Sequence, residues 1–229
     1  EDMPVSGSNW KGPLMMPNLL KEVDHIILMP RCARHVLAGS TLGLKAAVGY
    51  WRTDTRLEYH RDAATFQEKT AEGNTVWSLL DKQRLVLTAA DKILTSFGPD
   101  KGYIMQPETG LVIASESVVA HDMISLAWLL LNRESIPESE KDMFRDPYES
   151  QLVVTLGNHW VVGKLGGWLA ALTPEGLTRN DINTIWDDRV LNRAYQVLGG
   201  RPKIKIKTAN RAVPGEVVSR LTEMTTKQT

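Results

Sequence analysis

Short apolar runs separated by polar, helix-forming stretches make up most of the chain. Ile26 to Met29 is a continuous apolar run that ends at Pro30, a pattern typical of a strand buried on both faces in a parallel sheet. Arg84 to Ala90 and Gly110 to Ala114 are the next apolar runs, and Leu152 to Leu156 is a fourth candidate strand. Strands alternating with helices predict an α/β domain with a mostly parallel sheet and helices on both faces.

Helical periodicity and capping residues predict the remaining elements. We expect helices over Asn18 to Val23, Thr41 to Gly49 with Ser40 as its N-cap, Asp62 to Gln83, Ser117 to Asn132, Leu177 to Trp186, Arg189 to Leu198 and the stretch after Pro214. Tyr50 to Arg61 is polar and aromatic and predicts a loop. Strict alternation over Lys203 to Lys207 predicts an edge strand, which gives the carboxyl-terminal part a helix–strand–helix order.

The distribution of prolines and charges predicts the domain organisation. Residues 1–18 carry Pro4, Pro13 and Pro17 without periodicity and are expected to form an extended arm. Residues 19–229 are expected to form a single α/β domain, with a sub-boundary near 133–150, where charges and prolines gather. A first strand that is apolar on both faces would leave apolar side chains and backbone groups exposed unless another element packs against it. We therefore expect a second copy of the chain, or another polypeptide, to complete the sheet.

Polar residues that follow the predicted strands are the candidates for a functional site, because ligands bind beyond the carboxyl ends of strands in open α/β sheets. Arg31, Arg34 and His35 come directly after the first strand, and Lys45 lies in the helix that follows. Arginine offers a planar fork for a carboxylate or phosphate, and lysine offers a point charge. This group predicts a site for an anionic ligand.

Ser40 and Thr41 stand at the expected start of the Lys45 helix, where backbone N–H groups can bind an anion. The alternative for the whole basic segment is a solvated loop balanced by Asp54 and Glu58. We favour the ligand-binding interpretation because the segment follows a buried strand so closely.

Three further residues are candidates for the same site. His60 is a candidate metal ligand or general acid/base, since histidine titrates near neutral pH. Asp91 follows the second strand and Asp122 lies early in a helix, so we expect both carboxylates to converge with His35 and to bind the ligand or orient it. The alternatives are a surface histidine, a turn-forming Asp91 and an Asp122 that only complements the helix dipole. Cys32 is expected to be a small buried hydrophobe rather than a thiolate.

Composition narrows the class of partner. The chain has 27 Lys and Arg residues together and 27 Asp and Glu residues together. Because its net charge is zero, there is no electrostatic reason to expect binding to nucleic acid or to an anionic membrane surface. No apolar run approaches the roughly 20 residues of a membrane span. A single cysteine excludes an intrachain disulfide and a self-contained iron–sulfur cluster. We expect a soluble protein and favour the cytoplasm, with export after removal of a leader as the alternative.

The stretch DHIILMPRCARH, followed by LAGSTLGLKAAVG, resembles the central motif of the domain of unknown function 362 family (DUF362). In that family a strand ends in a Pro-Lys-x-Lys-Thr-His-like run, and a Thr-x-x-x-Lys-Asn-x-x-Gly segment follows. Arg31 and Arg34 stand near the family's lysines and His35 at its histidine. The second segment is matched by Thr41, Lys45 and Gly49, with Ala46 where the family has Asn.

A later segment, LVIASESVVAHD, is similar to the family's Ser-x-Asp-Pro-Val-Ala-x-Asp element. Ser115, Ala120 and Asp122 match it, whereas Ser117 and Val118 replace Asp-Pro. The resemblance runs over about residues 18–132 and more weakly to the carboxyl terminus. It implies an α/β fold and a site rather than a reaction. The family's upstream strand–helix units and its ferredoxin-like cysteine clusters have no counterpart here.

A fainter similarity links Gly43, Lys45 and His60 to the nickel-pincer lactate racemase family. This similarity implies that Lys45 contacts a cofactor and that His60 ligates a metal.

The expected function is binding of a small anionic molecule or of a cofactor, with a divalent metal as one option. Arg31, Arg34, Ser40, Thr41, Asp91 and Asp122 would bind the ligand, and His35, Lys45 and His60 would be catalytic if the protein is an enzyme. The competing class is a non-catalytic subunit or scaffold whose basic loop contacts a protein partner.

Overall fold

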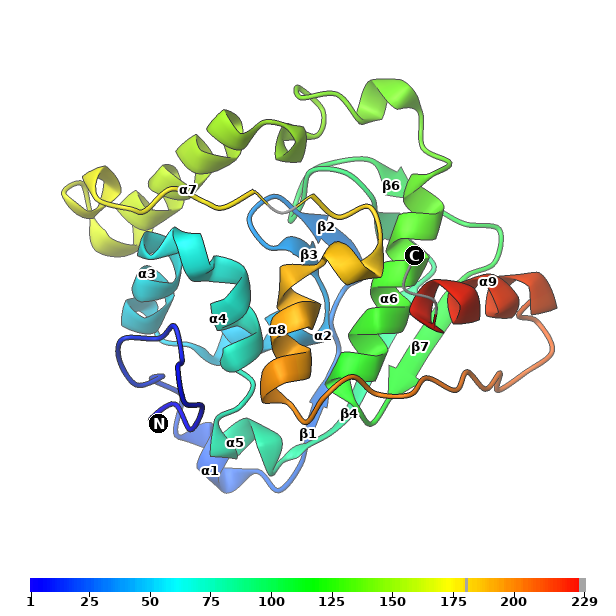
Figure 1. The fold of residues 1–229 in the computed structure, drawn as a ribbon, viewed down its shortest axis with the longest axis horizontal. Helices are drawn as coiled ribbons and strands as arrows, with labels where there is room; N and C mark the ends of the chain where they lie inside the picture. Colours follow the sequence, from blue (N-terminus) through cyan, green and yellow to red (C-terminus); the bar gives the residue numbers. More distant parts are fainter. Residues whose placement is uncertain (180, 227–229) are drawn as a thin grey trace.

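The computed structural model of the protein describes residues 1–179 and 181–226, whose strands form two small sheets (Figure 1). In the first sheet, β4 (Gln83–Ala90) lies between β1 (Ile26–Leu28), to which it is parallel, and β7 (Leu111–Ser115), to which it is antiparallel. The second sheet has the order β3-β2-β5-β6, and only its β2–β5 pair is parallel. The strands of the second sheet are β2 (Ala33–His35), β3 (Gly39–Thr41), β5 (Ile93–Leu94) and β6 (Ile104–Met105). The α/β class is confirmed, whereas the sheets are mixed rather than mostly parallel.

The helices follow the predicted order in the first part of the chain and depart from it later. In chain order they are α1 (Leu19–Glu22), α2 (Gly43–Ala46), α3 (Thr53–Arg61), α4 (Phe66–Glu72), α5 (Trp77–Leu80), α6 (Val118–Arg133), α7 (Gln151–Gly166), α8 (Arg189–Val197) and α9 (Gly215–Thr226). Short 3-10 turns join them, among them η1 (Ala47–Tyr50), η4 (Pro147–Glu149), η5 (Ala170–Leu172) and η6 (Ile185–Asp187).

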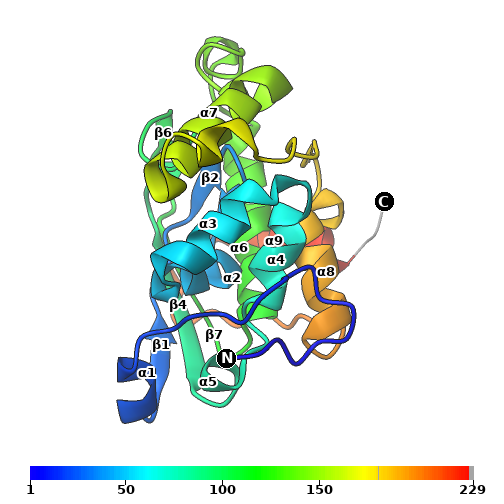
Figure 2. The same cartoon turned by 90° about the vertical axis from the view of Figure 1, so that its left-hand side faces the viewer.

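Helices cover one face of the β1–β4–β7 sheet. Figure 2 shows β1 and β4 at the left edge of the molecule, with α2, α4, α6 and α8 to their right. Ile26 and Leu28 of β1 are buried, but Ile27 between them is 57% exposed, and Val112 of β7 is 71% exposed. The expectation of a first strand buried on both faces, and of helices on both faces of this sheet, is therefore wrong for the described residues.

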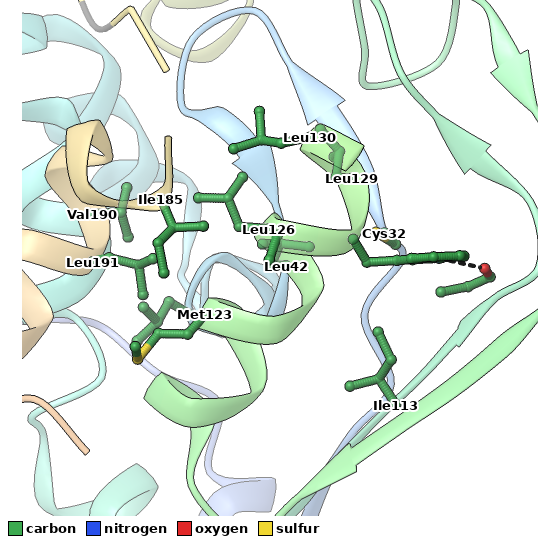
Figure 3. Packing of buried hydrophobic residues seen from close by; sticks show 14 of the residues in the cluster. Cys32, Leu42, Ile113, Met123, Leu126, Leu129, Leu130, Ile185, Val190 and Leu191 are labelled. Carbon is green, nitrogen blue, oxygen red and sulfur yellow. Dashed lines mark hydrogen bonds between the residues drawn. The ribbon is translucent and has the colours of Figure 1, made fainter. Parts of the chain in front are cut away.

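Helix α6 is the centre of the larger hydrophobic core. Its residues Met123, Leu126 and Leu129 are fully buried or nearly so and pack among side chains of α8 and the sheets (Figure 3). Ser117 begins this helix as predicted, because its Oγ accepts a hydrogen bond from the Ala120 N–H at 3.2 Å. The second core joins the amino-terminal arm, α3 and α4, and it includes Val154 of α7.

The amino-terminal arm has no helix or strand before α1, and it packs onto the domain. Trp10 and Leu14 are buried, and the ring of Trp10 lies 4.9 Å from that of Trp51. The terminal amine of Glu1 donates to the Leu14 carbonyl at 2.7 Å, and the Leu14 N–H donates back to Glu1 at 2.8 Å. These contacts fold the arm back on itself.

Several predicted elements differ from the observed ones. Leu152 to Leu156 is part of helix α7 rather than a strand, and the expected loop over residues 50–61 is mostly helix α3. Ser40 lies in β3 and caps no helix. The expected helix over residues 177–186 is replaced by extended chain and η6, apart from Asn180, which lies outside the described residues. Residues 203–207 pair with no strand in the described chain, although Ile204 and Ile206 pack against the larger core.

Within residues 1–179 and 181–226, every helix is too short or too polar to cross a lipid bilayer.

Candidate functional site

Four basic side chains from neighbouring elements form what we call the basic cluster: His35 of β2, Lys45 of α2, and Arg56 and His60 of α3. Burial is the main cause of the lowered pKa values of His35, Lys45 and His60, and each also responds to the charge of other members. Lys45 and His60 lower the pKa of His35, and Arg56 lowers the pKa of Lys45. The structure therefore brings together His35, Lys45 and His60, which the sequence singled out as catalytic candidates.

The hydrogen bonds of His35 determine which of its ring nitrogens carries the proton. Its Nδ1 accepts from the Leu37 N–H at 3.1 Å and from the Ala38 N–H at 3.3 Å. Since both partners are donors, Nδ1 is unprotonated, and the neutral ring carries its hydrogen on Nε2. Burial lowers the pKa of His35 well below its ordinary value, and the charges of Lys45 and His60 add to the shift. His35 is therefore a neutral donor through Nε2 at physiological pH.

His60 has the opposite tautomer, which is set by Asn158 of α7. The Asn158 amide nitrogen donates to the His60 carbonyl at 2.7 Å, so the amide oxygen faces the ring and accepts from Nδ1 at 3.0 Å. Nε2 therefore keeps its lone pair. Burial lowers the pKa of His60 to about 4, the hydrogen bond with Asn158 opposes this shift, and the charges of Lys45 and Arg56 strengthen it. His60 is therefore a neutral acceptor through Nε2.

Lys45 is a half-buried amine without an acidic partner. It forms no ion pair or side-chain hydrogen bond in the described chain, and neither does Arg56. Burial lowers the pKa of Lys45 to about 8, and the positive charge of Arg56 contributes. At pH 7 most Lys45 amines are still protonated, so the cluster carries two unpaired cationic groups.

Asp122 of α6 holds the short helix on which Lys45 lies. Its two carboxylate oxygens accept from the Gly43 N–H at 2.7 Å and the Leu44 N–H at 2.8 Å, and Oδ1 also contacts His121 Nδ1 at 2.8 Å. A side chain at position 43 would meet this carboxylate, because an added Cβ would lie 2.7 Å from Asp122 Oδ1. Asp122, expected to bind or orient a ligand, is 3% exposed, and the contacts it makes orient α2.

Arg34 lies outside the basic cluster. Successive side chains of a strand point to opposite faces, so Arg34 and His35 leave β2 in opposite directions. The Arg34 guanidinium is buried 3.9 Å from the ring centre of Tyr148 in η4, and burial lowers its pKa. Its Nε and Nη1 have no hydrogen-bond partner in the described chain. The neighbouring acids Asp146 and Glu149 instead pair with Arg133.

The other predicted ligand-binding residues are also separate from the cluster. The exposed Arg31 donates to the Pro99 carbonyl and lies 3.9 Å from Asp100. Ser40 is paired with Arg34 across β3 and β2, on the face turned away from His35. Thr41 pairs with Ala33, and its buried Oγ1 has no partner in the described residues.

Asp91 does not converge with His35. In the parallel β2–β5 pair Ala33 lies opposite Leu94, so His35 follows the paired position and Asp91 precedes it. The two residues therefore lie at opposite ends of the pair, and Asp91 is exposed. The expected convergence is therefore wrong for Asp91 and His35, and the third strand end also lies elsewhere, because β7 is antiparallel to β4. Its end at Ser115 lies opposite Val86, far from the end of β4.

A family model described as a domain of unknown function, DUF362, matches residues 1–127, which is more than half of the 229 residues. The chain belongs to the DUF362 family. No curated protein and no solved structure matches the chain. The DUF362 match contains all four residues of the basic cluster, together with Gly43 and Asp122, which orient α2. It excludes α7, so Asn158, which sets the tautomer of His60, belongs to the part of the chain beyond the match.

Two residues at or beside the basic cluster, Arg56 and Asn158, were not anticipated from the sequence. Arg56 precedes His60 by four residues, a spacing that places both on one face of a helix. That signal was available, but the polar stretch that contains it was predicted to be a loop. Asn158 was missed because α7 was predicted to begin as a strand, and no sequence signal connects it to His60.

The structure also shows the surroundings of Cys32 and the arrangement of potential metal ligands. Cys32 lies among the apolar side chains around α6 (Figure 3), and burial raises the pKa of its thiol to about 12, as expected for a hydrophobe rather than a nucleophile. No group of three or more His, Cys, Asp or Glu side chains within residues 1–179 and 181–226 is arranged to hold a metal ion. His60 Nε2 is nevertheless free to act as a single ligand.

Proposed function

We propose that this DUF362 protein binds a small anionic molecule at the basic cluster. The observation that carries the proposal is the absence of any acidic partner for Lys45 and Arg56 in the described chain. Two neighbouring cations repel each other, and one of them is partly removed from water. An anion bound between them would relieve both costs. The proposed ligand therefore replaces the counter-ion that the protein does not supply.

The two histidines favour an anion that also carries a hydroxyl group. Lys45 and Arg56 would hold the ionised oxygens, and His35 Nε2–H would donate to one of them. His60 Nε2 can only accept, so it needs a donor from the ligand. Hydroxy acids and monoprotonated phosphates have this combination of groups. A partly neutral amine near pH 8 beside two neutral imidazoles also suits general acid–base catalysis.

A scaffold function, in which the basic loop contacts a protein partner, has less support. Arg34 and His35 are 2% and 7% exposed, so only Arg31 of that segment reaches the surface. A buried segment offers little contact area to another protein.

Calorimetric titration with sulfate and with oxalate tests anion binding. Lys45→Met keeps the length of the side chain and removes its charge. Since a charge-assisted contact contributes about 1.5–3 kcal/mol, we expect this variant to bind at least about tenfold more weakly. Lys92→Met is the matched control, because Lys92 is exposed in the turn between β4 and β5. Equal affinities for wild type and Lys45→Met, or no binding to either anion, would count against the proposal.

A metal-bearing anionic cofactor is the second candidate ligand. Histidine ligands of metals commonly donate their other ring nitrogen to an oriented acceptor, as His60 Nδ1 does to Asn158. The cofactor would supply most of the coordination, with His60 Nε2 as the protein's ligand and Lys45 near the anionic part. Elemental analysis of natively purified protein tests this candidate. Stoichiometric metal that is lost in His60→Ala would support it, and metal retained by that variant would exclude His60 as the ligand.

A further inference from the structure

Helix α7 presents apolar side chains on both of its long faces. Val154, Asn158 and Val162 form the inner face and are buried against the rest of the molecule, mainly α3. Leu152, Leu156 and Trp160 form the opposite face at intervals of four residues and are 60–69% exposed. A helix that is apolar all round is normally buried on all sides. The outer face of α7 therefore lacks the cover that its sequence implies.

The turn after α7 extends this exposed surface. Trp168, Leu169 and Leu172 are 65–78% exposed, and η5 packs back against α7, where an added Cβ on Gly163 would lie 3.1 Å from that of Ala171. We call these six side chains the α7 apolar face: Leu152, Leu156, Trp160, Trp168, Leu169 and Leu172. Helix α7 and the turn that follows it lie at the upper left of the molecule in Figure 1.

The size of this face is that of a protein interface. Two tryptophans and four leucines with these exposures present on the order of 700 Å² of apolar surface, beyond the largest patch of most monomers, about 300–600 Å². A standard interface buries about 800 Å² on each partner. The α7 apolar face is thus close in size to one side of a standard interface.

The charge of this region indicates what kind of partner fits it. Residues 151–174 contain no Asp or Glu and one charged residue, Lys164, whose Nζ lies 5.5 Å from the Trp160 ring centre. Charged partners would therefore lose water without gaining an ion pair. An anionic lipid surface would require a basic patch, which a single lysine does not provide. The complementary surface is uncharged and apolar.

We propose that the α7 apolar face binds the same face of a second copy, so that the protein is a two-fold symmetric dimer. Leu156 is central in the row, with Leu152 four residues before it and Trp160 four residues after it. A two-fold axis at Leu156 makes an antiparallel helix pair in which Leu152 of each copy packs beside Trp160 of the other. Gly157, beside the axis, has open space where a side chain would project, which lets the partner helix approach closely.

This dimer would also stabilise the basic cluster. The inner face of α7 holds His60 through both hydrogen bonds of Asn158. A partner that covers the outer face would restrict movement of α7 and so maintain the His60 tautomer. The self-association itself does not depend on the proposed anion binding.

Sedimentation analysis of the full chain at micromolar to 100 µM concentration tests the proposal. We expect wild type at twice 25.6 kDa. Leu156→Asp should weaken the dimer at least tenfold, since it places two carboxylates on the symmetry axis. Leu19→Asp is the matched control, because Leu19 is 61% exposed on α1, away from α7, and should leave the dimer intact. Circular dichroism checks that both variants fold.

Three outcomes would overturn the dimer. The first is a wild-type chain that stays monomeric throughout this concentration range. The second is a dimer that persists in Leu156→Asp but is lost in Ile27→Asp, which would assign the contact to the open face of the β1–β4–β7 sheet. The third is a wild-type monomer that co-sediments with neutral phosphatidylcholine vesicles and loses this binding in Leu156→Asp, which would assign the α7 apolar face to a lipid surface.

Discussion

The pKa values of Lys45 and of the two histidines in the basic cluster are lowered because these side chains are buried without an acidic neighbour. Each loses water, which disfavours its charged form, and the cationic neighbours act in the same direction. The result is two neutral imidazoles of opposite tautomer beside an amine that titrates near pH 8. These properties lead to two predictions at the scale of single residues.

Anion binding near pH 8 should take up protons. About half of the Lys45 amines are neutral at that pH, and a bound anion favours the charged form and raises the pKa of Lys45. Calorimetry with sulfate in buffers of different ionisation enthalpy should therefore show uptake of up to about half a proton at pH 8. The uptake should disappear at pH 6, where Lys45 is already protonated. Binding at pH 8 without proton uptake would show that Lys45 does not contact the anion.

Stability should fall in acid because of His60. Its pKa is about 4 in the folded protein against an ordinary 6.5, so the unfolded chain binds more protons between these values. The free energy of unfolding therefore rises with pH from 4 to 6.5, and the contribution is complete above 6.5. The difference in pKa corresponds to roughly 3 kcal/mol. Urea denaturation across this range should show a flatter pH dependence for His60→Gln than for wild type.

His25→Gln serves as the control for that measurement, since His25 is exposed just before β1. A pH dependence that is identical in wild type and His60→Gln would mean that His60 is solvated in the folded protein.

At the scale of elements, α2 and α6 are joined by the Asp122 carboxylate. Helix α2 has four residues, too few to be stable alone, so its position depends on the hydrogen bonds to Gly43 and Leu44. Gly43 makes this contact possible, because an added Cβ would also lie 3.0 Å from Val118 and 3.1 Å from Val86. The position of Lys45 therefore depends on a glycine two residues before it.

Gly43→Ala should destabilise the protein and disturb the basic cluster. The new methyl group must displace Asp122 or two packed valines, and overpacking of this kind costs about 1–3 kcal/mol. Gly49→Ala is the matched control, because nothing lies within 4 Å of the added Cβ at that position. We expect thermal unfolding to show a lower melting temperature for Gly43→Ala alone. Equal melting temperatures would indicate that α2 is not held against α6 as observed.

The sequence predicted elements well where the apolar pattern was clear, as in β4 and β7, and where a cap supported it, as in the Ser117-capped α6. It failed where the pattern was ambiguous. Leu152 to Leu156 is a short apolar run, and such a run cannot distinguish a strand from the start of an apolar helix. Helix α3 was missed because only Thr55 and Tyr59 of it are buried, so its apolar periodicity is weak.

Part of the basic cluster could be predicted and part could not. His35, Lys45 and His60 were identifiable as titratable residues that follow a buried strand, whereas Arg56 and Asn158 required knowledge of α3 and α7. The expected roles of Arg34 and Asp91 depended on strand direction and side-chain alternation. Single-sequence patterns do not determine strand partners or directions. The register of β2 against β5 separates Asp91 from His35, and the antiparallel direction of β7 separates its end from that of β4.

At the scale of the whole molecule, the part matched by the DUF362 model supplies the basic cluster, and the part after it holds the cluster in place. Val154 of α7 enters the core formed by the amino-terminal arm and α4, and Asn158 fixes His60. Both the α7 apolar face and one face of the β1–β4–β7 sheet carry large exposed apolar side chains. The proposed dimer covers the first of these.

The most direct test of anion binding at the basic cluster is a nuclear magnetic resonance titration of the Lys45 side chain, with its signal assigned by its loss in Lys45→Arg. We expect the Lys45 Cε resonance to titrate with a midpoint near pH 8 in the free protein and at a higher pH in the presence of sulfate. A midpoint near the ordinary 10.5 that sulfate leaves unchanged would contradict both the buried, unpaired state of Lys45 and its role in binding an anion.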